Sequence, residues 1–159
     1  SIEDSDNLSL TSVSSRYDLR KSTRLDVKSR RDKFFIGTTG SVRGDSYFTD
    51  FRLDELGKEI ILLAKYGRID ADLVSKNFEM INISSSYTDI YLTFDPSASY
   101  NLDIRHINAF VTTPGSDSSL EKKVLNEEKK EFLTFGTVGK SPGEKKVSIE
   151  ATKGNIFIK

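Results

Sequence analysis

The sequence predicts an all-β protein in which a single chain winds into a β-solenoid, with coils of about 17–21 residues. A short motif returns along the chain: a long or planar residue, a small or turn-forming pair, then an apolar residue that restarts a strand. Its equivalent positions are Arg31, Phe48, Tyr66, Tyr87 and His106, which follow one another at nearly equal intervals. A nearly fixed period of this length is the signature of a solenoid.

The composition agrees with this fold class. Apolar residues make up 36% of the chain and charged residues 30%, which is lean for a compact globule of 159 residues. A solenoid tolerates such a composition, because each coil buries only a thin inward row of side chains.

The strand pattern begins close to the N-terminus. We expect residues 1–7, which are polar and acidic, to be frayed, and residues 8–159 to form a single solenoid domain. Apolar and polar residues then alternate as in half-buried strands, for example over Met80–Ser84. Ile60–Leu63 is a continuous apolar run and is typical of a strand covered on both faces.

Stacked coils would place equivalent side chains on top of one another, about 4.8 Å apart. Aromatic rings at these positions would contact their neighbours, and glycines would occupy the corners that need a left-handed backbone. The predicted structural ladder consists of Phe48, Tyr66, Tyr87 and His106, with Gly67 and Gly154 in the adjoining turns.

One segment interrupts the repeat. The interval from His106 to Phe135 is longer than the regular step, and it contains the loop Pro114–Ser119 followed by a densely charged stretch. We expect a charged, hairpin-like excursion near residues 115–135, with its turn near Asn126–Glu128. A short helix is the alternative, since Glu127 and Glu131 lie at helical spacing.

His106 is the only histidine and the first candidate for catalysis. A general base needs an orienting carboxylate and a nearby nucleophile. The sequence offers Asp103, but residues at an odd spacing on a strand point to opposite faces. We therefore interpret His106 as a partly exposed ladder position and predict no catalytic residues.

Carboxylates offer a second candidate. Asp70 and Asp72 share one face of a strand, and Asp89 and Asp95 could add oxygens for calcium or for sugar chemistry. Because Arg68 flanks the pair and no glycine-rich Asp repeat is present, a solvated face is the favoured interpretation. We predict no metal and no cofactor.

Basic residues crowd the first third of the chain and could serve a nucleic acid or an anionic glycan. The favoured interpretation is a charged flank that protects open strand edges. These residues are Arg16, Arg20, Lys21, Arg24, Lys28, Arg30, Arg31 and Lys33.

Composition limits the partners. The 24 basic and 24 acidic residues cancel, so no global field gathers nucleic acid, and we predict no nucleic-acid partner. No apolar run approaches the roughly 18 residues of a membrane span.

The absence of cysteine excludes disulfides and thiolate chemistry. Because the chain starts at Ser1 with no leader, we expect that an export signal has been removed.

The repeats resemble the adhesin β-solenoid family of exported bacterial proteins, found mostly in Bacteroidetes. The resemblance rests on Leu63–Gly67, Ile83–Ile90 and Val147–Ile156 and covers Leu8 to Lys159. Arg31, His106 and Lys153 stand where the family more often has Tyr. The resemblance implies a right-handed single-chain β-helix and an extracytoplasmic location, and it brings no catalytic residues.

These observations favour a non-enzymatic, exported surface or envelope protein, a rigid scaffold for adhesion or binding. A glycan or an envelope protein is the expected partner, and open solenoid ends could pair two copies. The alternative is a carbohydrate-active lyase or hydrolase, which would need a groove with close carboxylates.

Overall fold

The structure, a computed structural model that describes residues 1–159, confirms the all-β class. All ten strands belong to one mixed sheet, and no helical segment suited to crossing a bilayer is present. The strands are β1 (Ile2–Val13), β2 (Arg16–Arg30), β3 (Lys33–Val74), β4 (Met80–Phe94), β5 (Tyr100–Ile107), β6 (Phe110–Thr112), β7 (Ser118–Asn126), β8 (Glu131–Val138), β9 (Lys146–Thr152) and β10 (Asn155–Ile158).

Neighbouring strands in the N-terminal half are parallel and keep a constant sequence offset. Leu8 of β1 lies opposite Leu25 of β2, which lies opposite Val42 of β3, so the two steps are equal. The step between β3 and β4 is slightly longer, as from Ile60 to Ile81. Leu25, Val42, Ile60 and Ile81 are fully buried. The apolar alternation in the sequence thus lines up across strands to form a continuous core.

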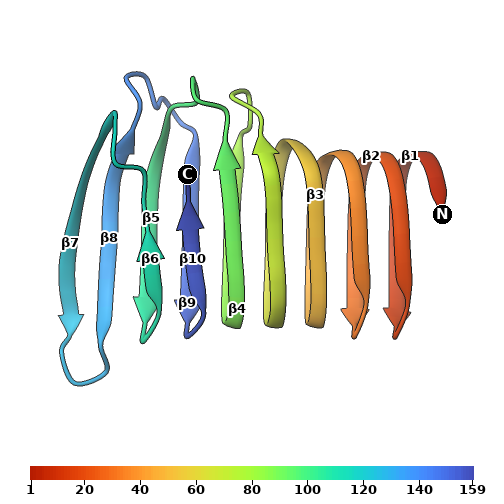
Figure 1. Cartoon of the computed structure of the whole chain (residues 1–159), viewed down its shortest axis with the longest axis horizontal. Coiled ribbons are helices and arrows are strands. Elements are labelled where there is room, and N and C mark those ends of the chain that lie inside the picture. Colours follow the sequence, from red (N-terminus) through yellow and green to blue (C-terminus); the bar gives the residue numbers. More distant parts are fainter.

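Strand β3 is too long to be straight. It has 42 residues; Lys33–Tyr47 pair with β2, and the part from Glu59 onward pairs with β4. Figure 1 shows its ribbon turning back on itself repeatedly between these partners. Just after β3, the amide of Ser75 donates a hydrogen bond to the carbonyl oxygen of Leu56 at 2.9 Å, which joins two parts of this segment.

The last strands do not follow chain order in space. Strand β9 pairs in parallel with β4 on one side and with β5 on the other, and β10 lies between β4 and β6 (Figure 1). Val147 of β9 lies opposite both Ile81 and Leu102, and all three are buried. The repeat spacing alone placed residues near His106 directly after those near Tyr87, whereas the C-terminal segment separates them.

The charged segment near residues 115–135 is a β-hairpin, as predicted, and the helical alternative is wrong. Strands β7 and β8 pair antiparallel, with the turn at residues 127–130. Strand β8 also pairs antiparallel with β5, so the hairpin closes one end of the strand order and β7 becomes the outer edge.

Two expectations about local strand structure are corrected. Residues 2–7 belong to β1 and pair with β2, as Ile2 does with Leu19, instead of fraying. The run Ile60–Leu63 is covered on one face only. Leu62 is buried while Leu63 is 46% exposed, because the side chains of a strand alternate between its two faces.

A second aromatic stack, which lies inside the molecule, was not predicted from the sequence. The rings of Tyr17, Phe34 and Phe51 stack at centroid distances of 5.0 and 5.1 Å, with Phe34 and Phe51 buried. The three residues are equally spaced in the sequence, so the same period that predicted the fold could have identified this stack.

Non-glycine residues with a left-handed backbone occur at equivalent turns along the sheet. Arg31, Phe48, Tyr66 and Tyr87 have φ values of 59°, 53°, 53° and 50°. Two positions earlier stands a buried residue, as with Ser29 before Arg31 and Ser85 before Tyr87. The sequence-based equivalence of these four residues thus corresponds to one repeated backbone geometry. The same conformation recurs at Ser14, Lys153, Asn108 and Lys130.

Candidate functional site

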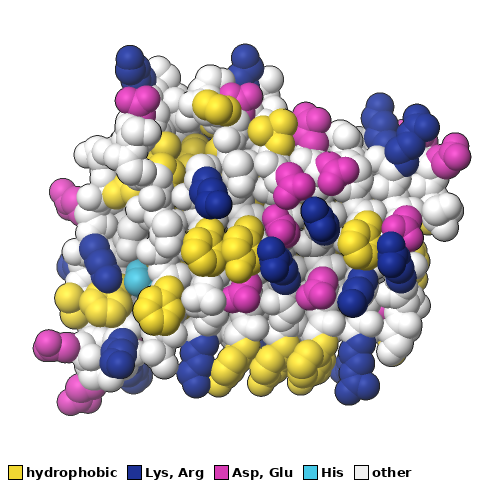
Figure 2. Space-filling model, viewed as in Figure 1, with side chains coloured by type: hydrophobic (Ala, Val, Ile, Leu, Met, Phe, Trp, Pro, Cys, Tyr) yellow, Lys and Arg dark blue, Asp and Glu magenta, His cyan; other side chains and the backbone are white.

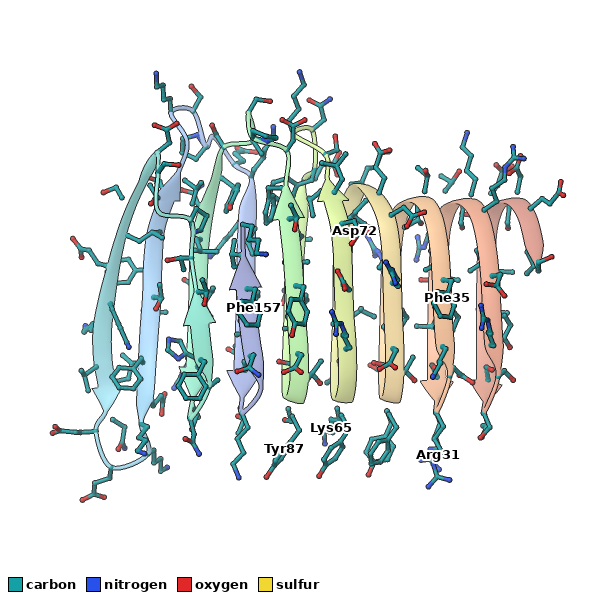
Figure 3. All side chains as sticks on the ribbon, viewed as in Figure 1. Arg31, Phe35, Lys65, Asp72, Tyr87 and Phe157 are labelled. Carbon is teal, nitrogen blue, oxygen red and sulfur yellow. The ribbon has the colours of Figure 1, made fainter.

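The most regular exposed feature is an aromatic stack formed by Phe48, Tyr66 and Tyr87. The ring centroids lie 4.7 and 5.0 Å apart and the planes are within 13° of parallel. Each ring remains at least 37% exposed along its edge. Figure 2 shows a row of hydrophobic side chains at the lower edge of the molecule with basic side chains at its ends, and Figure 3 labels Tyr87, Lys65 and Arg31 along this edge.

The residues of the stack also have a strained, left-handed backbone, which opposes the favourable stacking energy. A left-handed conformation costs a non-glycine residue about 1–2 kcal/mol, and each aromatic pair contributes about 0.5–1.5 kcal/mol. The two effects are similar in size, so stacking offsets the strain instead of adding much net stability. Lys153 continues the row, since its Nζ donates a hydrogen bond to the Tyr87 hydroxyl at 3.0 Å, which raises the pKa of Lys153.

His106 does not belong to this stack, so that part of the predicted ladder is wrong. It lies opposite Ala151 of β9, which lies opposite Ser85 of β4, and it is only 2% exposed. The residue with the left-handed backbone in this segment is Asn108, two positions later. His106 therefore occupies the inward position where the other segments carry serine or alanine.

Gly67 and Gly154 both follow a left-handed residue and have positive φ values of their own, 147° and 98°. A Cβ at Gly67 would lie 2.1 Å from the carbonyl oxygen of Thr49, and one at Gly154 would lie 2.2 Å from that of Thr88. The neighbouring backbone approaches so closely that only glycine fits at either position.

A basic groove of about 480 Å³ lies beside the stack. Residues from β1, β2 and two parts of β3 line it, among them Val13, Lys28, Arg30, Asp45, Tyr47 and Lys65. Lys28 lies opposite both Thr11 and Asp45, and Arg30 lies opposite both Val13 and Tyr47. Because equivalent residues of successive strands form its walls, the groove runs along the direction in which the strands follow one another.

The cations of this groove have no acidic partners within the chain. Arg16, Arg24 and Arg68 pair with aspartates two positions away, at 3.3, 2.9 and 3.0 Å. Lys28, Arg30 and Lys65 form no ion pair, and Asp45 is the single carboxylate of the groove. Of the basic residues in the first third, Arg16, Arg20 and Arg24 are paired with aspartates, whereas Lys28 and Arg30 at the groove are unpaired.

Tyr47 presents a differently oriented ring. Its plane is inclined at 85° to Phe48 and 84° to Tyr66, while those two rings are nearly parallel to each other. The ring of Tyr47 is therefore nearly perpendicular to the rings of the aromatic stack. The ring is 38% exposed, and the guanidinium carbon of Arg30 lies 5.7 Å from its centroid. Sequence reasoning missed Tyr47, although it directly precedes the repeated left-handed position.

His106 lies in a separate hollow of about 320 Å³ with Glu121, Lys122 and Thr134. Its Nε2 is 3.2 Å from Thr134 Oγ1, a distance at which a base could act on a hydroxyl, while its buried Nδ1 has no partner. Burial, and then the charge of Lys122, lowers the pKa of His106. No carboxylate orients the ring. Asp103 points the other way, toward Lys146 at 4.0 Å, as the odd spacing predicted.

The carboxylates considered from sequence are not brought together. Asp70 pairs with Arg68, Asp89 accepts hydrogen bonds from Asn155, and Asp95 accepts them from Ser97. Asp72, labelled on β3 in Figure 3, forms no ion pair. No group of three or more His, Cys, Asp or Glu side chains is arranged to hold a metal ion.

Comparison with known proteins adds no further assignment. No protein-family model, no curated protein and no solved structure matches the chain.

Proposed function

We propose that this protein is a β-solenoid scaffold that binds an extended anionic glycan in the basic groove, without chemical turnover. The observation that carries the proposal is that one groove gathers three unpaired cations and one exposed aromatic ring, with Arg30 and Tyr47 opposite each other on neighbouring strands. A linear polymer with repeated negative charge and apolar ring faces matches this surface.

The solenoid itself is part of the proposal. The constant sequence offset between strands, the equivalent left-handed turns and the turning ribbon of Figure 1 support a chain that winds in coils. Right-handed winding is expected because connections between parallel neighbours in a sheet are almost always right-handed. Such a body keeps side chains at a regular spacing, which suits a polymer ligand.

The ligand class follows from the groove. Pyranose rings carry C–H groups on their faces and pack on aromatic rings by burial of apolar surface. Tyr47 would lie flat against a sugar of a chain that follows the groove. Lys28, Arg30 and Lys65 would pair with its carboxylates or sulfates. A nucleic acid is less favoured, because a net charge of zero provides no wider field and the groove presents one such ring.

Binding without turnover is proposed for a chemical reason. Glycoside hydrolysis normally employs two carboxyl groups on either side of the scissile bond. The groove contains Asp45 as its single carboxylate, and His106 lies in a different hollow.

An exported, envelope-associated location belongs to the same proposal, since extended anionic glycans are cell-surface polymers. Cell fractionation tests this location.

The test is a titration of the purified protein with polygalacturonate, dextran sulfate and uncharged dextran. We expect the two anionic polymers to bind, with an affinity that falls as salt rises, and dextran to bind weakly or not at all. Tyr47→Ala should weaken binding about tenfold through the lost ring contact. Lys28→Gln combined with Arg30→Gln should weaken it further.

Matched controls are Phe110→Ala, which removes another exposed ring, and Lys123→Gln, which removes a surface cation of β7. Neither should change the affinity. Equal binding by wild type and Tyr47→Ala would overturn the proposed groove, and preferential binding of single-stranded DNA would overturn the glycan. Release of reducing sugars from these polymers would show that the protein is an enzyme.

A further inference from the structure

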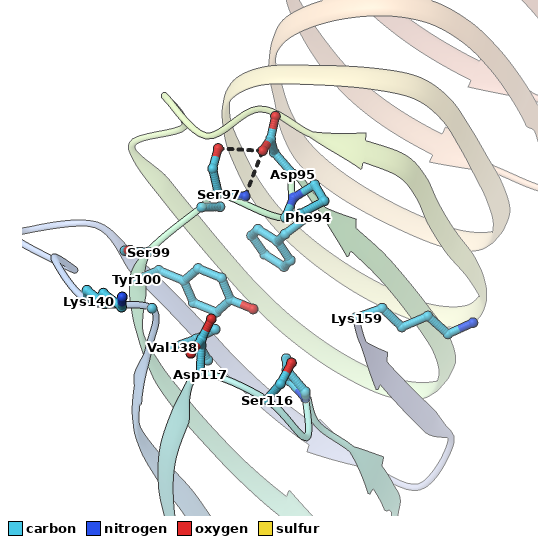
Figure 4. A pocket seen from close by; sticks show the side chains of 14 residues that line it. Phe94, Asp95, Ser97, Ser99, Tyr100, Ser116, Asp117, Val138, Lys140 and Lys159 are labelled. Carbon is cyan, nitrogen blue, oxygen red and sulfur yellow. Dashed lines mark hydrogen bonds between the residues drawn. The ribbon is translucent and has the colours of Figure 1, made fainter.

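A third pocket lies among the loops that join the strands at the opposite edge of the molecule from the aromatic stack. This loop pocket has a volume of about 350 Å³, and its lining includes Asp95, Ser97, Ser99, Tyr100, Asp117 and Lys140. Figure 4 shows that these residues come from separate loops, with Lys159 completing the wall. No residue is shared with the basic groove.

Tyr100 supplies the observation that points to a ligand. Its side chain is 1% exposed and its ring stacks on Phe94 at a centroid distance of 4.3 Å. The phenolic oxygen is buried and has no hydrogen-bond partner. Figure 4 shows it directed into the space bounded by Phe94, Ser116 and Asp117. A phenylalanine ring would fill the same space, so the hydroxyl adds a buried polar group that has no hydrogen-bond partner within the chain.

The remaining polar groups of the lining include both donors and acceptors. Asp95 and Asp117 offer acceptors, Lys140 offers a donor and three serine hydroxyls offer both, whereas Figure 4 shows the Lys159 side chain directed away from Tyr100. None of these four charged side chains forms an ion pair. Asp95 is held in place by Ser97, whose amide and hydroxyl donate to it at 2.8 and 2.6 Å. Hydrogen bonds to the charged carboxylate lower the pKa of Asp95 and keep it an acceptor.

Gly139 brings two of the loops into contact. Its φ is +78°, and a Cβ there would lie 2.2 Å from the hydroxyl oxygen of Ser99. Its amide donates to the carbonyl oxygen of Asp117 at 2.6 Å. Glycine at this position therefore allows the walls of the pocket to approach one another.

We infer that the loop pocket is a binding site for one neutral sugar ring, with the Tyr100 hydroxyl and the Asp95 carboxylate bonding to its hydroxyl groups. A pyranose has donors and acceptors in similar number, as the lining has. The inference does not depend on the basic groove.

The experiment follows binding of methyl β-D-glucopyranoside, methyl β-D-galactopyranoside, methyl α-D-mannopyranoside and N-acetylglucosamine to the whole chain by saturation-transfer NMR and calorimetry. Acetate and methylammonium serve as charged probes. We expect saturable binding of at least one sugar and none of either ion. Tyr100→Phe should lose at least about tenfold in affinity while its melting temperature stays the same or rises.

Tyr47→Ala in the basic groove is the matched control and should keep full sugar binding, so the two proposals can fail separately. Four outcomes would overturn the inference: no sugar of the panel binds, Tyr100→Phe binds as well as wild type, an ion binds instead, or Tyr100→Phe melts markedly lower. A markedly lower melting temperature would mean that the hydroxyl contributes to the stability of the fold.

Discussion

The α-carbon of Gly67 approaches the backbone of Thr49 so closely that a Cβ at position 67 would lie 2.1 Å from the Thr49 carbonyl oxygen. Gly67→Ala should therefore destabilise the protein by more than about 2 kcal/mol, through this clash and through the φ of +147°. Denaturant unfolding measures the change. Gly115→Ala is the control, because no atom lies within 4 Å of its Cβ, and it should stay within about 0.5 kcal/mol.

The carboxylate of Asp32 is only 1% exposed and is stabilised by hydroxyls instead of a cation. It accepts hydrogen bonds from Ser12 at 3.1 Å, Ser29 at 2.5 Å and the amide of Ser15 at 2.7 Å. Asp32→Ala leaves these donors buried without an acceptor and should destabilise the protein by roughly 2–4 kcal/mol. The exposed Asp50 gives the comparison: if Asp50→Asn lowers the free energy of unfolding as much, burial of the cluster is not the cause.

The insertion of β9 between β4 and β5 predicts which engineered cysteines can join. Ser84 and Glu150 are exposed neighbours on adjacent parallel strands, whereas Ser84 and Arg105 are separated by β9. A Ser84→Cys, Glu150→Cys pair should form a disulfide under mild oxidation, and a Ser84→Cys, Arg105→Cys pair should not. The chain has no native cysteine to interfere. The reverse result, measured by mass spectrometry, would mean that the strands follow chain order.

His106 should make stability depend on pH. Burial and Lys122 lower its pKa in the folded protein, so below about pH 6.5 the unfolded chain binds the proton first. This contribution to stability is complete above about pH 6.5 and decreases as pH falls toward the lowered pKa. Chemical unfolding of wild type and His106→Ser between about pH 7 and pH 5 measures it. The variant, which carries the serine found at Ser85, should show a shallower slope; identical slopes would contradict this prediction.

Local pattern in the sequence predicted several elements of the fold. The strands, the steps between the first of them and the equivalence of Arg31, Phe48, Tyr66 and Tyr87 follow from alternation and from the period of the motif, and the β7–β8 hairpin follows from the interruption of that period and from strand-forming residues. Such features are readable because side-chain direction alternates along a strand and the corners tolerate few conformations.

Features that depend on contacts between distant segments could not be predicted in this way. The position of β9 depends on its pairing with β4 and β5, which lie far from it in the sequence, and the spacing of the motif carries no information about such pairing. The error at His106 arose because the intervals were counted on planar side chains, whereas the repeated feature is the left-handed residue, here Asn108. The basic groove likewise depends on which of the N-terminal cations pair with aspartates, and only the structure separates them.

The central claim is that an anionic glycan lies along the basic groove, and the most direct measurement is an NMR titration of the ¹⁵N-labelled protein with an oligogalacturonate. We predict amide shifts that cluster at Ser12, Ser29, Ser46 and Lys65, on successive parallel segments, and that need about tenfold more ligand in Tyr47→Ala. Shifts confined to the loop pocket or to the hollow at His106, or no shifts at all, would contradict it.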